Sequence, residues 1–353
     1  MLNSRTQRIL KSIIEQYISR AVPVPSQRIV DDYTLGVSPA TIRNEMVVLE
    51  REGYLIRPYS SSGSIPTDKG YRFYVESLTE VSLPLGEQRL ISHLFHQVER
   101  ELSEALHLAA ALMSQTAQNV ALVTIPKATG CRFKHVELVS VQDSLVLLIL
   151  VLYGANVRQK LITFEGTSEG KSTQEQLTVI ANKLSAFYAG MTHSQISNAH
   201  KEITPVEEQV TSWIVKIMEA EDSHRDEESY LHGLRYMLNQ PEFAQTNRME
   251  GLMELVERHE LLRTILPREM RKRGVQVLIG KENRSEVIHD YSVVISHYGL
   301  PGEAVGTIGV LGPTRMHYAR AIATVAYLSS VLSALVSDLY KRQAHRKNPP
   351  LAD

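Results

Sequence analysis

The sequence predicts a soluble α+β protein of several domains, and three observations lead to this fold class. The chain has 353 residues, enough for two or three domains of ordinary size. Hydrophobic residues make up 43% of it and charged residues 22%, as in globular proteins with well-filled cores. Helical patterns and strand-like patterns both occur, and they fall in separate blocks along the chain.

The first block, residues 1–80, predicts three short helices followed by a β-hairpin. A helix is expected over Ser4–Ser19; VPVP then breaks it, and a second helix is expected over Ser26–Tyr33. After the third helix, Leu55–Tyr59 is typical of a strand, Ser60–Ser64 of a turn, and Ile65–Pro66 of a returning strand.

The third helix of this block has two different faces. Ser38 is a good N-cap, Pro39 suits the first helical turn, and Gly53 suits a left-handed stop. Apolar side chains at helical spacing predict one buried face, whereas the other face mixes small, polar and basic side chains. The first set is Ile42, Met46 and Leu49, and the second is Ala40, Arg43, Asn44, Val47 and Arg51.

Three helices and a hairpin in this order are typical of a winged helix-turn-helix domain, whose third helix enters the major groove of DNA. The second face suits that role, because an asparagine amide pairs with an adenine edge and an arginine with guanine or phosphate. The first helical turn and the hairpin can contact phosphates. The expected DNA-binding residues are Ser38, Ala40, Thr41, Arg43, Asn44, Arg57, Tyr59, Ser61, Lys69 and Arg72.

Other modules share this order, namely winged helices that bind proteins and purely structural three-helix domains. The net charge of −1 does not indicate an anionic partner, and residues 1–78 hold ten Lys or Arg against eight Asp or Glu. Binding of a nucleic acid would therefore need a local cluster of positive charges, which Arg43, Arg51 and Arg57 could provide.

Beyond residue 80 the pattern predicts one α/β domain interrupted by a helical segment; a separate domain in series is the alternative. A long helix is expected from Gly86 to about Asn119, and polar helices with acidic clusters occupy Thr167–Gln245. An amphipathic helix over Thr314–Tyr340 closes the domain. The expected strands are Ala121–Ile125, Phe133–Val141, Leu145–Leu152, Val157–Phe164, Val275–Ile279, Tyr291–His297 and Gly306–Leu311.

Catalysis and metal binding have little support in the sequence. Cys131 could be a nucleophile, but no partner follows from spacing, and a small structural residue is the other interpretation. His93 and His96 are three residues apart on an expected helix, with His107 farther along, yet no carboxylate lies at ligand spacing. The glycine-rich run Tyr298–Pro313 fits neither the dinucleotide fingerprint nor the P-loop. We expect no enzyme activity, cofactor or metal.

No membrane segment is expected. The N-terminus lacks the apolar core of a signal peptide, and the aliphatic run Leu145–Tyr153 is too short for a span. Ala321–Ser337 is uncharged, but its apolar residues recur at helical spacing, as in a buried amphipathic helix. The single cysteine, Cys131, excludes an internal disulfide and fits a reducing cytoplasm.

Two long motifs are similar to those of one known family. SPATIRNEMVVLEREGYL with GSIPTDKGYRFYV lies near the N-terminus, and GEAVGTIGVLGPTRMHYARAI covers Gly302–Ile322. Both resemble motifs of the HrcA family, the heat-inducible transcription repressors. The similarity extends from about Leu2 to Tyr340.

The resemblance implies three parts: a winged helix at 1–80, a GAF-like domain made of 81–166 and 246–340, and a dimerisation domain inserted at 167–245. Residues 341–353 are then a disordered basic tail. The resemblance also implies a cytoplasmic, nucleoid-associated bacterial homodimer that binds an inverted-repeat operator of chaperone operons. A GroEL-type chaperonin is the implied partner that maintains its activity. The alternative is a regulator whose GAF-like domain senses a small molecule.

One position departs from the family pattern. Members commonly carry an arginine in the wing where this chain has Ser64. The serine thus removes a charge from the hairpin tip, and we expect a phosphate or minor-groove contact of the wing to be lost. We then expect the slope of log K against log salt to be shallower by about one unit.

Overall fold

The structure is a computed structural model that describes residues 2–32, 38–59, 62–79, 81–98, 101–126, 131–142, 145–153, 157–163, 174–199, 203–224, 229–243, 247–257, 261–265, 274–301 and 304–347. The chain divides into two compact units. The first combines Met1–Pro126 with Glu227–Asp353, and the second is Lys127–Asp226. Helices and strands occur in both, so the fold is mixed α and β.

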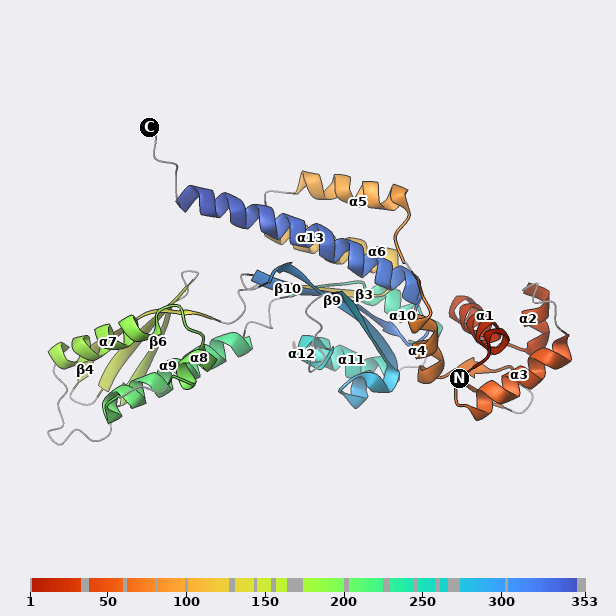
Figure 1. Ribbon diagram of the computed structural model, residues 1–353, viewed down its shortest axis with the longest axis horizontal. Helices are drawn as coiled ribbons and strands as arrows, with labels where there is room; N and C mark the ends of the chain where they lie inside the picture. The colour runs from red at the N-terminus through yellow and green to blue at the C-terminus, as the bar shows by residue number, and fades with distance from the viewer. Residues whose placement is uncertain are drawn as a thin grey trace. The chain divides into compact units, whose positions relative to one another are not determined.

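The N-terminal region of the first unit is a small helical domain with a two-stranded hairpin (Figure 1). Its core is built by fully buried aliphatic side chains, including Ile9 and Ile13 of the first helix and Leu49 of the third. Its elements are α1 (Ser4–Arg20), α2 (Ser26–Asp32), α3 (Pro39–Arg51), β1 (Leu55–Ile56), β2 (Ile65–Pro66) and α4 (Asp68–Glu76).

The rest of the first unit is an antiparallel sheet with helices on both faces. The sheet has five strands in the order β7-β3-β10-β9-β8, and β10 pairs with β9 over their whole lengths. Its strands are β7 (Ser229–His232), β3 (Val120–Thr124), β10 (Ala304–Pro313), β9 (Tyr291–Leu300) and β8 (Val275–Ile279).

Two helices, α6 (Leu102–Ala117) and α13 (Tyr318–Lys347), lie across one face of this sheet, and α5 (Leu85–Gln97) packs on the outside of α13 (Figure 1). A second apolar cluster, which includes Phe243 and Tyr291, covers the other face. The elements there are α10 (Leu234–Leu238), η2 (Pro241–Phe243), α11 (Asn247–Glu257), α12 (Leu261–Ile265) and η4 (Glu286–Ile288), and η3 (Gly280–Glu282) follows β8.

The second unit is a three-stranded antiparallel sheet with helices on one face. The strand order is β4-β5-β6, and alternate residues of β5 are buried against the helices. Its elements are β4 (Phe133–Gln142), β5 (Leu145–Leu152), β6 (Val157–Thr163), α7 (Gln174–Tyr188), α8 (His193–Ser197) and α9 (Pro205–His224).

The structure differs from the sequence-based expectations of domain organisation in three ways. Residues 341–347, expected to belong to a disordered tail, continue helix α13 to Lys347. The inserted unit spans 127–226 rather than 167–245, because β4, β5 and β6 form a core with α7 and α9, while β7 pairs with β3 in the other sheet. The long helix expected over 86–119 is two helices, α5 and α6, since Glu101 has extended backbone angles at the start of α6.

Within the described part of the chain, one helical stretch is long and apolar enough to cross a membrane by length and composition, namely Tyr318–Leu339 of α13. Its residues Val325, Leu328 and Leu332 are fully buried in the same cluster as the sheet residues Val294 and Ile308. The apolar character of α13 is thus accounted for by packing in the first unit.

Candidate nucleic-acid interface

Helix α3 begins and ends as its sequence predicts. Ser38 Oγ accepts a hydrogen bond from the Thr41 amide at 3.2 Å and lies 3.0 Å from Thr41 Oγ1, so both residues serve the N-cap. Pro39 occupies the first turn. At the other end, Gly53 has a φ of +75°, the left-handed conformation that favours glycine after a helix.

The two faces of α3 are separated as expected. Ile42 and Leu49 are fully buried, whereas Ala40, Arg43 and Asn44 are exposed. Among the described residues, Arg43 and Asn44 have no hydrogen-bond or ion-pair partner. Their polar groups are therefore available to a ligand.

Two further side chains extend this exposed face. Val47 is 51% exposed one turn after Arg43, and Arg51 is exposed at the end of the helix, also without a partner in the described part of the chain. Val47 was absent from the expected binding residues, although its position one turn after Arg43 and Asn44 could have identified it. A valine there can contact a thymine methyl group.

A buried carboxylate fixes α3 against α1. Glu45 Oε2 accepts a 2.6 Å hydrogen bond from the Thr6 hydroxyl, and Glu45 Oε1 accepts from Arg5 Nη2 at 2.6 Å and Arg5 Nε at 3.0 Å. The Thr6 hydrogen bond, helped by Arg5 and opposed by burial, lowers the pKa of Glu45 below its usual value. The orientation of α3 is thus set by polar contacts as well as by apolar packing.

A second carboxylate joins α3 to the hairpin. Glu50 Oε1 accepts from Arg57 Nη2 at 2.9 Å and from Ser64 Oγ at 2.6 Å. Ser64 and Val24 also exchange backbone hydrogen bonds, each 3.0 Å, which tie the hairpin to the α1–α2 connection. Arg57 therefore has an intramolecular partner, unlike Arg43.

The position of Ser64 corrects the expectation that it lies at the hairpin tip. Its side chain is fully buried, because its hydroxyl faces Glu50 and its backbone pairs with Val24. Ser64 therefore stabilises the point where the hairpin loop joins β2, and the serine does not remove a charge from an exposed tip.

The exposed end of the hairpin carries an aromatic residue. Tyr59 is 76% exposed, and its backbone amide and carbonyl bond to the Ser62 side chain at 3.1 and 2.8 Å. The Tyr59 ring is thus held outward beside a short turn. Ser61, also an expected binding residue, lies outside the described residues.

The last two expected residues, on α4, are engaged within the protein. Lys69 Nζ donates to the Glu52 carbonyl at the end of α3 (2.7 Å) and lies 4.3 Å from the Tyr54 ring centroid. Arg72 donates to the Val277 carbonyl of β8 at 2.7 Å and pairs with Glu282 through Nε at 2.8 Å. The structure does not bring Arg72 together with the exposed face of α3.

The residues considered for catalysis or metal binding have other surroundings. Cys131 is buried, and its Sγ donates to the Met218 carbonyl at 3.3 Å. His107 lies beside His232, which the sequence pattern did not indicate, with ring nitrogens 3.4 Å apart; burial and His107 lower the pKa of His232. No group of three or more potential metal ligands occurs among the described residues.

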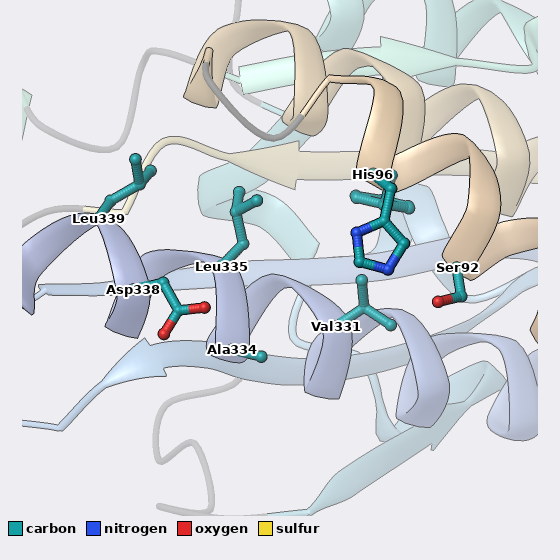
Figure 2. A pocket seen from close by; sticks show the side chains of 8 residues that line it. Ser92, His96, Val331, Ala334, Leu335, Asp338 and Leu339 are labelled. Carbon is teal, nitrogen blue, oxygen red and sulfur yellow. The ribbon is translucent and has the colours of Figure 1, made fainter. Parts of the chain in front are cut away.

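A cavity of about 280 Å³ lies between α5 and α13 (Figure 2). The imidazole of His96 extends from α5 toward Val331 of α13, and the Asp338 carboxylate lies farther along the same helix (Figure 2). The remaining wall is mainly aliphatic, so this cavity has few polar groups to orient a ligand.

Comparison with known proteins gives a consistent result along the whole chain. The family profile described as "HrcA protein C terminal domain" matches residues 103–322. The heat-inducible transcription repressor HrcA of Dehalococcoides mccartyi is 51% identical over 340 residues, which cover 96% of this chain and 97% of that protein. The repressor of the same name from Herpetosiphon aurantiacus is 41% identical over 348 residues, which cover 96% of each chain.

Among solved structures, the crystal structure of a hypothetical protein at 2.2 Å resolution is similar in fold. Its TM-score is 0.58 and its sequence identity 23%, with 96% of this chain and 98% of that chain covered. This likeness concerns the fold alone.

Proposed function

The chain belongs to the HrcA family of heat-inducible transcription repressors, and from this premise we propose that it represses transcription by binding an inverted-repeat operator as a homodimer. It is a repressor and not an enzyme. The operator belongs, in this proposal, to heat-shock chaperone operons. The N-terminal region acts as a winged helix, and the five-stranded sheet with its helices as a GAF-like domain.

The observation that carries the DNA-binding proposal is the exposed face of α3. Arg43 and Asn44 stand side by side on a capped helix, with no described residue competing for their polar groups. In the major groove, Asn44 would pair with an adenine edge and Arg43 with guanine or phosphate. Ala40 and Val47 leave room for close approach and suit thymine methyl groups.

The hairpin supplies the second contact in this proposal. Tyr59, the most exposed of its large side chains, would donate to a phosphate near the groove. Arg57 would have to leave Glu50, or share its guanidinium, to do the same. We therefore assign the wing a smaller electrostatic role than α3.

A homodimer is supported by a face of the three-stranded sheet that carries exposed aliphatic side chains. Cross-strand partners share a face, so Val139, Leu147 and Leu161 form one row on the side away from α7 and α9. Val139 is 39% exposed and Leu161 55%. Ile149 and Val157 lie on the same face beside the polar Glu137 and Gln159, and we propose that this face is buried between two copies.

We further propose that a GroEL-type chaperonin maintains the active repressor, as the family resemblance implies. A single chain that exposes this aliphatic sheet face is prone to aggregate before it meets a second copy. A chaperonin that holds such chains would raise the supply of active dimers. Misfolded protein would compete for the chaperonin during heat shock, and repression would fall.

In vitro selection from random duplex DNA with the purified full-length chain tests the proposal, followed by footprinting with and without chaperonin. We expect an inverted repeat with two protected half-sites, separated by about one or more helical turns. Enrichment of an asymmetric single site, or of no sequence, would refute it. Equal occupancy with and without chaperonin after repeated heating would refute the chaperonin part alone.

A further inference from the structure

The N-terminal region is joined to the five-stranded sheet domain by charged contacts between residues far apart in sequence. The end of α1 meets the turn between β10 and α13, and α4 meets β8 and η3. None of these contacts lies on the exposed face of α3. They instead affect how that face is oriented relative to the sheet domain.

Arg315 is the centre of the first contact. It is only 8% exposed, and all three guanidinium nitrogens donate to other parts of the chain. Nη1 donates to the carbonyl of Ile18 in the last turn of α1 at 2.6 Å, Nη2 donates to Gln240 at 2.8 Å, and Nε pairs closely with Glu242. A buried cation at the C-terminal end of a helix is favourably placed.

The second contact lies at the start of α4. Arg72 pairs with Glu282 and donates to the Val277 carbonyl on the edge strand β8, while the Lys281 amide donates to Asp68 at 3.0 Å. Gly280 has a φ of +52°, and a Cβ there would lie 2.3 Å from the Asp68 carboxylate. The positive φ favours glycine at this position, and a larger residue would also displace the Asp68 carboxylate.

Two buried tyrosines stand near both contacts. The rings of Tyr71 on α4 and Tyr318 on α13 are 5.7 Å apart, and the two residues are 2% and 0% exposed. The Tyr318 hydroxyl donates to the Thr314 carbonyl at 2.6 Å, one residue before Arg315. The N-terminal region is thus held by directional polar contacts with an aromatic pair beside them, an arrangement that favours one orientation.

We propose that Arg315 is a positioning residue for operator recognition, assisted by the Arg72–Glu282 pair: it holds the reading face of α3 in one orientation on the sheet domain. This proposal rests on the proposed function, since orientation matters only if two copies read two half-sites. When the α3 of one copy is bound to its half-site, a fixed orientation keeps the α3 of the other copy at a high effective concentration next to the second half-site. A loosely tethered α3 has to be ordered on binding, which reduces the affinity for the whole operator.

The orientation itself can be measured without DNA. Spin labels at Arg8→Cys on α1 and Ser330→Cys on α13, both exposed positions, report the distance between the two parts in a Cys131→Ala background. Labelled chains are mixed with excess unlabelled chains, so that each dimer carries one labelled chain. We expect a narrow distance distribution that broadens in Arg315→Met.

Arg320→Met is the matched control. Arg320 lies on α13, five residues after Arg315, and pairs with Glu87 of α5; none of its contacts with described residues reaches the N-terminal region. Its distance distribution should stay narrow. Arg72→Met, at a position whose side chain is 29% exposed, serves as a second test variant in case Arg315→Met does not fold.

Measured affinities for two DNAs then distinguish a loss of positioning in Arg315→Met from a loss of folding. On the selected inverted repeat, Arg315→Met should bind at least about tenfold more weakly, whereas on a single half-site it should change by less than about twofold. Equal losses on both DNAs, tighter operator binding, or an unbroadened distance distribution would overturn the proposal. Failure to select any inverted repeat would count against the proposed function, while the distance measurement would still test the docking.

Discussion

The hydrogen bond between Thr6 and Glu45 offers a direct test of how α3 is held. The Thr6 hydroxyl lies 2.6 Å from Glu45 Oε2 and 2.9 Å from Asn3 Oδ1, but it has a single proton. The charged and nearer carboxylate takes that proton. Both ends of the bond are buried, with Thr6 2% and Glu45 9% exposed.

Replacing Thr6 by valine keeps the shape and removes the donor. A hydrogen bond to a charged group contributes about 1.5–3 kcal/mol. Arg5 remains bonded to Glu45 in the variant, although its own side chain is 56% exposed. We therefore expect Thr6→Val to destabilise α3 by about 1.5–2 kcal/mol at neutral pH, near the lower end of that range.

The effect should depend on pH with a definite sign. Because the pKa of Glu45 is lowered in the folded protein, the stabilising contribution of this carboxylate is complete above the pKa that it has in the unfolded chain. That contribution is lost as the pH falls through the lower folded-state pKa. The destabilisation caused by Thr6→Val should accordingly shrink in acid.

Hydrogen exchange of α3 amides in the full-length chain measures the free energy of opening this helix. Thr6→Val, Glu45→Gln and the double variant form a thermodynamic cycle, and we expect a coupling of at least about 1 kcal/mol at pH 7. Additive effects within about 0.3 kcal/mol, or a coupling that grows as pH falls, would refute the reasoning.

Four further predictions concern DNA reading, charge, assembly and burial. Asn44→Ala should cost about 1–3 kcal/mol on the selected operator and little on random DNA, as titrations on both would show. Glu50→Gln should free Arg57 for a phosphate, so a plot of log K against log salt should steepen by about 0.9 per protomer; an unchanged slope would exclude this. Leu161→Glu should convert dimers to monomers in sedimentation experiments, whereas Val179→Glu, at a 67% exposed position on α7, should not. Tyr71→Phe should raise the thermal midpoint, because the buried Tyr71 hydroxyl has no partner among the described residues and burial raises its pKa; a lower midpoint would indicate a hidden partner.

Local signals predicted α3 well, because they depend on residues that are neighbours in sequence. The N-cap at Ser38 and the left-handed Gly53 fix the ends of the helix, and helical spacing separates Ile42 from Arg43. The same holds for β5 and β8, whose expected bounds agree with the structure.

The limits of the inserted unit could not be predicted in this way. The strands β4, β5 and β6 resemble those of the five-stranded sheet in composition, and alternation does not tell which sheet a strand joins. The sheet that each strand joins is determined by its pairing partners. Strand β5 pairs with β4 and β6, whereas β7, expected within the helical insertion, pairs with β3.

Long-range contacts also decided which basic residues are available. Arg72 was expected to extend the DNA-binding surface, but its partner Glu282 is 210 residues away in sequence. Ser64 was expected at an exposed tip and is buried against Glu50, 14 residues earlier. Composition and helical periodicity carry no information about such pairs.

The basic residues of α3, the hairpin and α4 consequently divide into two groups, and this division bears on specificity. Arg57, Lys69 and Arg72 are held by carboxylates or a helix-end carbonyl, so a phosphate must compete with an existing partner. Arg43 and Arg51 have no such competitor in the described part of the chain. Because phosphate contacts give affinity for any sequence, an arginine already paired within the protein adds less to non-specific binding than an unpaired one. In the proposed complex, recognition would depend more on base contacts from α3, which Glu45 and Glu50 hold by hydrogen bonds and which we propose Arg315 helps to orient.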